Sequence, residues 1–139
     1  MIVLDTNVVS ALMHPDGVKQ LLPWLGSVAR HDLYTTTITR AEIRYGIARL
    51  PDGARRTRIE QAADALFAEI TDRMLVFDSA AADRYGQLVA LRERLGQPIS
   101  IPDAQIAAIA FANRAAVATR DRDGFIDSGI QVIDPFTMK

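Results

Sequence analysis

The sequence predicts a three-layer α/β domain in which a central, mainly parallel sheet is flanked by helices. Short apolar segments, typical of buried strands, alternate along the chain with longer segments of helical periodicity. Parallel strands require crossover connections of this kind, which are usually helical. The chain has 139 residues, near the commonest size of one domain, and contains no linker, repeat or low-complexity segment. We therefore expect a single domain that covers residues 1–139.

The expected strands are short and rich in apolar or β-branched residues. They cover residues 2–4, 33–37, 75–77, 116–119 and 131–133. Between them, apolar residues recur at helical spacing in five stretches, marked by Leu21, Leu22 and Leu25; Ile43, Ile47 and Leu50; Ile59, Ala62, Ala63, Leu66 and Phe67; Tyr85, Leu88, Leu91 and Leu95; and residues 104–112. Residues 51–53 separate the second helix from the third, and Gly96 with Pro98 ends the fourth.

Composition excludes several kinds of chemistry. Hydrophobic residues make up 49% of the chain and charged residues 24%, as in an ordinary globular protein. Cysteine is absent, which excludes disulfides, thiolate nucleophiles and cysteine-ligated zinc or iron–sulfur centres. The amino terminus reaches Asp5 before any basic or long apolar run, so we expect a cytoplasmic protein without a membrane segment. The net charge of −1 predicts no general basic surface, so a nucleic acid would be bound locally or through a metal.

Four acidic residues are expected at one edge of the sheet. Asp5 ends the first strand, and Asp121 follows the strand at 116–119. Glu42 and Asp103 fall in the expected first turns of helices that leave the same side. Ligands of open α/β sheets bind beyond the carboxyl ends of the strands, where such segments meet. The sequence therefore predicts a cluster of four carboxylates.

Such a cluster is costly without a cation. Two carboxylates about 5 Å apart at an effective dielectric of about 20 repel each other by roughly 3 kcal/mol. A hard divalent cation removes this repulsion, and ligands that are all oxygen favour Mg²⁺ or Mn²⁺ over zinc. A metal-activated water hydrolyses a phosphodiester without a covalent nucleophile, with one residue of the cluster as the base. The acids are thus candidate metal ligands and catalytic residues.

Each acid also has a purely structural interpretation. The two acids on helices follow a hydroxyl residue at the spacing of a capping box: Thr39 with Glu42, and Ser100 with Asp103. Asp5 would cap a helix that begins near Val8, and Asp121 would shape a turn in residues 119–124. These interpretations leave open a noncatalytic binding module, but they do not predict that all four acids share one edge.

The motifs around the acids resemble those of a known family. They are VLDTN with Asp5, Thr6 and Asn7; TITRAEIRYGIARLP with Glu42; PISIPDAQIAAIA with Asp103; and VATRDRDGF with Thr119 and Asp121. In order and spacing, and over nearly the whole chain, they resemble PIN-domain ribonucleases, and among these the VapC toxins of the FitB-like branch. The resemblance implies a PIN-like fold and Mg²⁺-dependent endoribonuclease activity, as the toxin of a type II toxin–antitoxin system. The alternative is a noncatalytic PIN-like module that binds nucleic acid or protein.

The resemblance also implies roles for individual residues. Asp5 and Asp103 would be the strongest metal ligands, completed by Glu42 and Asp121. Asn7 and Thr119 would support them. The resemblance leaves Asp123 as an auxiliary ligand only. FitB-like chains often close with an Asn-Pro-Trp-like segment, where this chain has Asp-Pro-Phe at 134–136.

Partners follow from the same resemblance. It implies a homodimer, RNA as the substrate, and a cognate VapB/FitA-like antitoxin whose carboxyl-terminal segment wraps the toxin and obstructs its active site. DNA would be contacted only through the antitoxin, in a higher toxin–antitoxin assembly. Arg40 and Arg44 lie near Glu42 in the sequence, so contact with RNA or antitoxin and a solvated helix face are both open. The apolar stretch at 18–25 is interpreted as core rather than interface.

Overall fold

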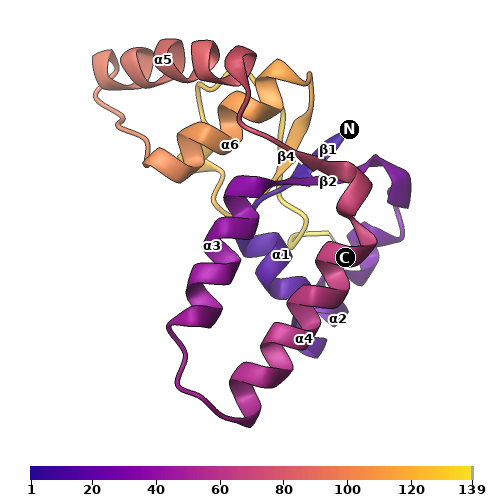
Figure 1. Cartoon of the computed structure of the whole chain (residues 1–139). Helices are drawn as coiled ribbons and strands as arrows, with labels where there is room; N and C mark the ends of the chain where they lie inside the picture. Colours follow the sequence, from indigo (N-terminus) through magenta and orange to yellow (C-terminus); the bar gives the residue numbers. More distant parts are fainter. Residues whose placement is uncertain (139) are drawn as a thin grey trace.

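The computed structural model describes residues 1–138 and has a five-stranded sheet between two layers of helices (Figure 1). The strands are β1 (Ile2–Leu4), β2 (Leu33–Thr36), β3 (Met74–Leu75), β4 (Ala116–Ala118) and β5 (Val132–Ile133). Their order in the sheet is β3-β2-β1-β4-β5, and every pairing between neighbours is parallel. The α-helices are α1 (Thr6–Leu12), α2 (Pro15–Leu25), α3 (Thr37–Ala48), α4 (Ala54–Glu69), α5 (Ser79–Arg94) and α6 (Ile101–Ala112). The predicted three-layer α/β fold is therefore confirmed.

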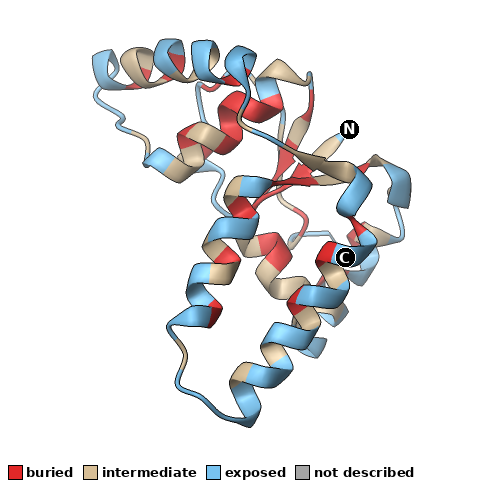
Figure 2. Ribbon diagram, in the orientation of Figure 1, coloured by how far each residue is buried: buried red, intermediate tan, exposed pale blue. Residues whose placement is uncertain are grey.

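The sheet separates two hydrophobic cores because neighbouring strand residues point to opposite faces. Leu4 and Ala118 pack with residues of α1 to α4, whereas Val3 and Val117 pack with residues of α5 and α6. All four side chains are buried, so the central strands are covered on both faces (Figure 2). Burial on both sides explains why these strands are continuous apolar runs rather than alternating ones.

The apolar stretch at 18–25 belongs mainly to the core. Leu21 and Trp24 of α2 are buried against α1 and α4, as the sequence predicted. Leu22, which lies on the other side of the helix, is 56% exposed. None of the helices in residues 1–138 is both long and apolar enough to cross a membrane.

Element boundaries differ from the predicted ones by one or two residues. The third strand covers Met74–Leu75 rather than 75–77, because the Asp78 amide donates to the carbonyl of Val76 (3.1 Å) and turns the chain toward α5. The first helix begins at Thr6 rather than near Val8, because Asp5 itself directly precedes the helix as its N-cap.

Candidate metal site at the carboxyl edge of the sheet

Strand order places a crevice beside β1 and β4. From β1 the chain continues to β2 and β3 on one side, and it later returns to β4 and β5 on the other. The reversal lies between β1 and β4, and the carboxyl ends of strands at such a switch point bind ligands in open α/β folds. Asp5 follows β1 directly, and Asp121 lies just beyond β4. Topology therefore brings these two acids to one crevice.

Asp5 is buried and held on both carboxylate oxygens. The residue is only 4% exposed to solvent. Oδ1 accepts a hydrogen bond from the Thr6 amide (2.8 Å), which makes Asp5 the N-cap of α1. Oδ2 accepts a hydrogen bond from the Thr119 hydroxyl (2.7 Å). Each oxygen retains further lone pairs, so capping the helix does not prevent Asp5 from binding a cation.

Thr119 and Asn7 connect the acids of β1 and β4. The Thr119 hydroxyl accepts hydrogen bonds from Asn7 Nδ2 (3.1 Å) and from the Asp121 amide (3.0 Å). Asn7 Oδ1 accepts from the Arg120 amide (3.1 Å). These bonds fix the chain that carries Asp121 against the start of α1, which is the supporting position that the motifs suggested for both residues.

Glu42 belongs to the cluster, but not in the manner of a capping box. The N-cap of α3 is Thr36, whose hydroxyl accepts from the Thr39 amide (3.1 Å), so the predicted capping pair of Thr39 and Glu42 is wrong. Glu42 lies in the second turn of α3 rather than the first, and its Oε1 accepts a hydrogen bond from the Thr6 hydroxyl (2.7 Å). The Thr6 and Thr39 hydroxyls lie 3.1 Å apart, so Thr6 is a site residue for which the sequence predicted no role, and Thr39 contacts Thr6 instead of capping the helix.

Asp103 and Asp121 meet above Gly124. Ser100 is the N-cap of α6, and its hydroxyl accepts from the Asp103 amide (3.3 Å), which confirms the predicted cap. The Gly124 amide donates to Asp121 Oδ1 (3.0 Å) and forms the expected turn. A Cβ at Gly124 would lie 2.6 Å from Asp121 Oδ2 and 3.2 Å from Asp103 Oδ2. Glycine therefore leaves the space in which the two carboxylates approach each other.

The electrostatics of the cluster favour a bound cation. The pKa of Asp5 is raised to about 6, mainly by burial and to a smaller extent by the charges of Asp103 and Glu42, although the hydrogen bonds from Thr119 and Thr6 lower it. The pKa of Asp103 is also raised, first by burial and then by the charges of Asp121 and Glu42. Negative charge is therefore unfavourable here until a positive charge is added.

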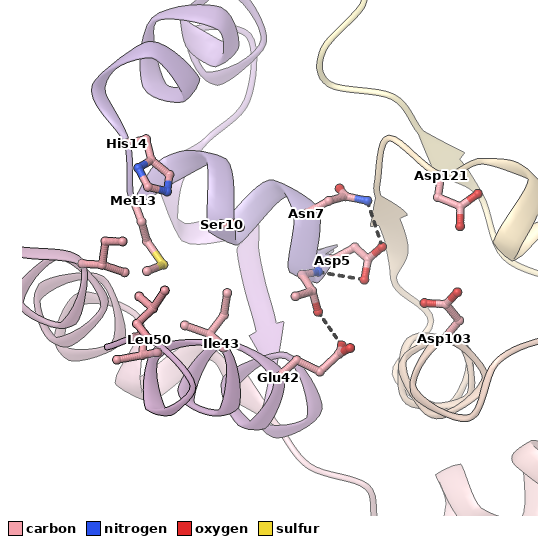
Figure 3. A pocket seen from close by; sticks show the side chains of 14 residues that line it. Asp5, Asn7, Ser10, Met13, His14, Glu42, Ile43, Leu50, Asp103 and Asp121 are labelled. Atoms are coloured by element: carbon pink, nitrogen blue, oxygen red, sulfur yellow. Dashed lines mark hydrogen bonds between the residues drawn. The ribbon is translucent and has the colours of Figure 1, made fainter. Parts of the chain in front are cut away.

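All four acids line one cavity of about 510 Å³. In Figure 3, Asp103 and Asp121 point toward each other beside Asp5, and Glu42 approaches from α3. The cavity continues from the acids along an apolar strip, which we define as Met13, Ile43, Ile47, Leu50 and Ile59. His14 also lines this cavity, although no motif marked it.

The donor set fits magnesium or manganese. The acids contribute only carboxylate oxygens, the ligands that these hard cations prefer. Within residues 1–138, no three acidic or histidine side chains are close enough to enclose a metal by themselves. Magnesium keeps several waters and commonly binds through one or two carboxylates, so an open arrangement fits it better than a closed protein cage.

Arg40 and Arg44 lie on another face of α3. Their guanidinium carbons stand 5.0 Å and 5.2 Å from the centre of the Phe67 ring, and Arg44 also pairs with Asp64 of α4 (2.8 Å). Neither lines the cavity of the acids in the described part of the chain, and Asp123 does not line it either. The two arginines connect α3 with α4, so contact with RNA or antitoxin stays a prediction for them.

Comparisons with known proteins agree with the fold and the motifs. The family model described as PIN domain matches residues 2–129. The chain is 39% identical over 137 residues to the plasmid stability protein StbB of Pseudomonas syringae pv. tomato, covering 98% of this chain and 99% of the relative. It is 37% identical to a VapC ribonuclease of Sinorhizobium fredii, with 98% of each chain covered, and 36% identical to Toxin FitB of Neisseria gonorrhoeae, with 98% and 99% covered.

A solved structure supports the same assignment. A chain in the structure of FitAB bound to a DNA fragment matches with a TM-score of 0.89 and 33% identity, over 100% of this chain and 98% of that one. A family model that covers most of the sequence, together with relatives similar over their full length, shows that this chain belongs to the PIN-domain family.

Proposed function

We propose that this PIN-domain protein is a metal-dependent endoribonuclease that acts as the toxin of a type II toxin–antitoxin system. The observation that carries the proposal is that four carboxylates, from four separate segments, line one cavity at the switch point of the sheet. The names of two relatives, a VapC ribonuclease and Toxin FitB, support the same activity. RNA is the substrate, and the cytoplasm is the compartment in which the toxin would meet it.

Asp5 and Asp103 are the proposed principal ligands of Mg²⁺, with Mn²⁺ as a substitute, and Glu42 and Asp121 complete the site. Such an ion supplies Lewis acidity toward a phosphate oxygen and lowers the pKa of an attacking water. The chain's own part is orientation and proton acceptance. Thr119 and the Thr6 amide hold the Asp5 carboxylate in one position, and the Thr6 hydroxyl holds Glu42. One carboxylate of the four accepts the proton of the water.

Cleavage of RNA by purified protein tests this proposal. Wild type should cleave in Mg²⁺ or Mn²⁺ and not in EDTA, and Asp5→Asn or Asp103→Asn should lose the activity while keeping the circular dichroism of the fold. The products should carry 5′-phosphate and 3′-hydroxyl ends, because water is the nucleophile. Full activity of Asp5→Asn would overturn the site, and 2′,3′-cyclic phosphate ends would overturn the mechanism.

A VapB/FitA-like antitoxin is the proposed partner, bound along the apolar strip with its end over the acids. The strip and the acids form one continuous cavity, so a single extended segment with apolar side chains and a basic group would complement both parts. We also propose a homodimer as the toxin's own assembly, with DNA bound only by the antitoxin. Growth arrest on expression of the chain, relieved by a small neighbouring reading frame, tests the pairing. Arrest that no neighbour relieves would contradict it.

A noncatalytic module is the second candidate, because Asp5 is a true helix cap. In that case the carboxylate has no need of a cation. Mg²⁺ should then leave the melting temperature unchanged, whereas a metal site predicts stabilisation of the folded state by binding. A thermal melt with and without Mg²⁺ therefore separates the two candidates.

A further inference from the structure

Arg92 is a buried cation near the end of α5. It is only 3% exposed, and its guanidinium donates to backbone carbonyls: Nε to Gln97 (2.6 Å), and Nη1 to Ile126 (2.6 Å) and Gly124 (3.3 Å). Among residues 1–138, no carboxylate forms an ion pair with it. Burying an unpaired charge is costly, so the position requires a reason beyond packing.

The carbonyls belong to two separate segments, and each of them leads to an acid of the site. Gln97 lies in the connection between α5 and α6, which continues to Ser100 and then to Asp103. Gly124 and Ile126 lie in the segment that directly follows Asp121. One guanidinium therefore ties together the two backbone segments that deliver these carboxylates.

The point held by Arg92 is also where the two carboxylates approach each other. The Gly124 carbonyl accepts a hydrogen bond from Arg92. A Cβ on the same residue would lie close to both Asp121 Oδ2 and Asp103 Oδ2. Displacement of Gly124 would therefore change the space between the carboxylates. The positive charge of Arg92 acts in the same region, because it opposes the rise in the pKa of Asp103.

We propose that Arg92 is a positioning residue that fixes Asp103 and Asp121 relative to each other and thereby sets the metal affinity of the site. It touches neither metal nor substrate and acts through the two backbone segments. This inference rests on the proposed metal-dependent function. Groups that orient metal ligands from outside the coordination typically change metal affinity by about 10–100-fold when they are mutated.

Arg84 provides a matched control on the same helix. Its Nη2 donates to the carbonyl of Ser128 (2.9 Å), and its guanidinium stacks on Phe111 at 3.9 Å. It thus binds the same carboxyl-terminal region from the same helix, but within residues 1–138 its hydrogen bond goes to Ser128 rather than to the carbonyls that Arg92 binds. Loss of Arg84 should cost stability without altering the separation of the carboxylates.

The experiment measures Mn²⁺ binding by electron paramagnetic resonance for wild type, Arg92→Met, Arg92→Lys and Arg84→Met, beside their melting temperatures. We expect Arg92→Met to bind Mn²⁺ at least about tenfold more weakly. Arg92→Lys should recover part of the affinity, because an ammonium reaches one carbonyl but cannot bridge three. Arg84→Met should keep the wild-type affinity whatever its melting temperature.

Wild-type affinity in Arg92→Met, or losses of affinity that follow melting temperature equally in the Arg92 and Arg84 variants, would overturn the proposal. If neither Arg92 variant folds, hydrogen exchange of the wild type decides, since Mn²⁺ should protect residues 95–100 and 122–127 together; protection of only one segment would overturn it. A wild type that binds Mn²⁺ and cleaves RNA while Arg92 proves irrelevant leaves the proposed function intact. A wild type that binds no Mn²⁺ overturns the metal-dependent function, and this role of Arg92 with it.

Discussion

Replacement of Asp5 by asparagine should stabilise the metal-free protein at neutral pH while abolishing RNA cleavage. Burial raises the pKa of Asp5 from 3.8 to about 6, so ionisation of this carboxyl costs the folded state about 3 kcal/mol more than the unfolded state. Asparagine removes that cost. It also places an amide against the Thr119 hydroxyl, which loses a hydrogen bond worth about 1 kcal/mol. The net gain is about 2 kcal/mol.

The stability difference between wild type and Asp5→Asn should depend on pH. Because the pKa of Asp5 is raised in the folded state, the unfolded chain releases this proton first as pH rises. The metal-free wild type should therefore be most stable with respect to this group below about pH 4, lose stability between about pH 4 and 6, and stay at the lower level above that range. Asp5→Asn should show no such loss, so its advantage should appear only at the higher pH.

Urea unfolding in EDTA at pH 4 and pH 7.5 measures both effects. We expect Asp5→Asn to be more stable than wild type by about 2 kcal/mol at pH 7.5, and less stable by about 0.5 kcal/mol at pH 4. Asp78→Asn is the control, because Asp78 caps α5 through the Ala81 amide (2.9 Å) on an exposed surface, and asparagine caps equally well. A destabilised Asp5→Asn at pH 7.5, or the same difference at both pH values, would refute the reasoning.

Three further predictions concern the cavity and the proposed cation. Mg²⁺ should raise the melting temperature of wild type at pH 7.5, and a melt of Asp5→Asn should show little or no rise. Gly124→Ala should leave stability within about 1 kcal/mol, because only the ends of the Asp121 and Asp103 side chains must move. It should nevertheless weaken Mn²⁺ binding and RNA cleavage, and unchanged binding would contradict the close approach at this glycine. Gly46→Leu should weaken antitoxin binding by more than about tenfold in calorimetry, because Gly46 lines the cavity where a Cβ has open space. Gly86→Leu is the control, because a Cβ at Gly86 also has open space but lies on α5, away from the cavity. It should stabilise its helix as much as Gly46→Leu stabilises α3, without changing the affinity for the antitoxin.

The acids at strand ends were predictable from the sequence because topology alone places them. An acid directly after a buried strand must lie at the carboxyl edge of a parallel sheet, which is where Asp5 and Asp121 are found. The position of Asp103 was equally predictable, because Ser100 marks the start of its helix. The position of Glu42 in its helix could not be predicted, since Thr36 and Thr39 both have the chemistry of an N-cap and only the fold selects Thr36.

Arg40, Arg44 and Arg92 show where sequence reasoning stops. Proximity in sequence put the first two near Glu42, but residues two apart on a helix do not face each other, so both guanidinium groups stack on Phe67 instead. Arg92 follows Leu88 by four residues and therefore shares its buried face. Its charge argues for exposure, and only the carbonyls of two distant segments explain its burial. Such partners depend on tertiary structure that one sequence does not contain.

Capping and metal binding, which compete as interpretations of the sequence, are compatible in the fold. Thr36 caps α3 and Ser100 caps α6, so neither Glu42 nor Asp103 is needed at a helix end. Asp5 does cap α1, but through one oxygen only. Its other oxygen accepts a hydrogen bond from the Thr119 hydroxyl rather than from a lysine or arginine side chain. Helix ends are therefore satisfied, while four carboxylates line one cavity and no ion pair is formed by any of them within residues 1–138. Burial first, and then the charges of the neighbouring acids, raise the pKa of Asp5 and Asp103. A divalent cation at the proposed site would offset both costs.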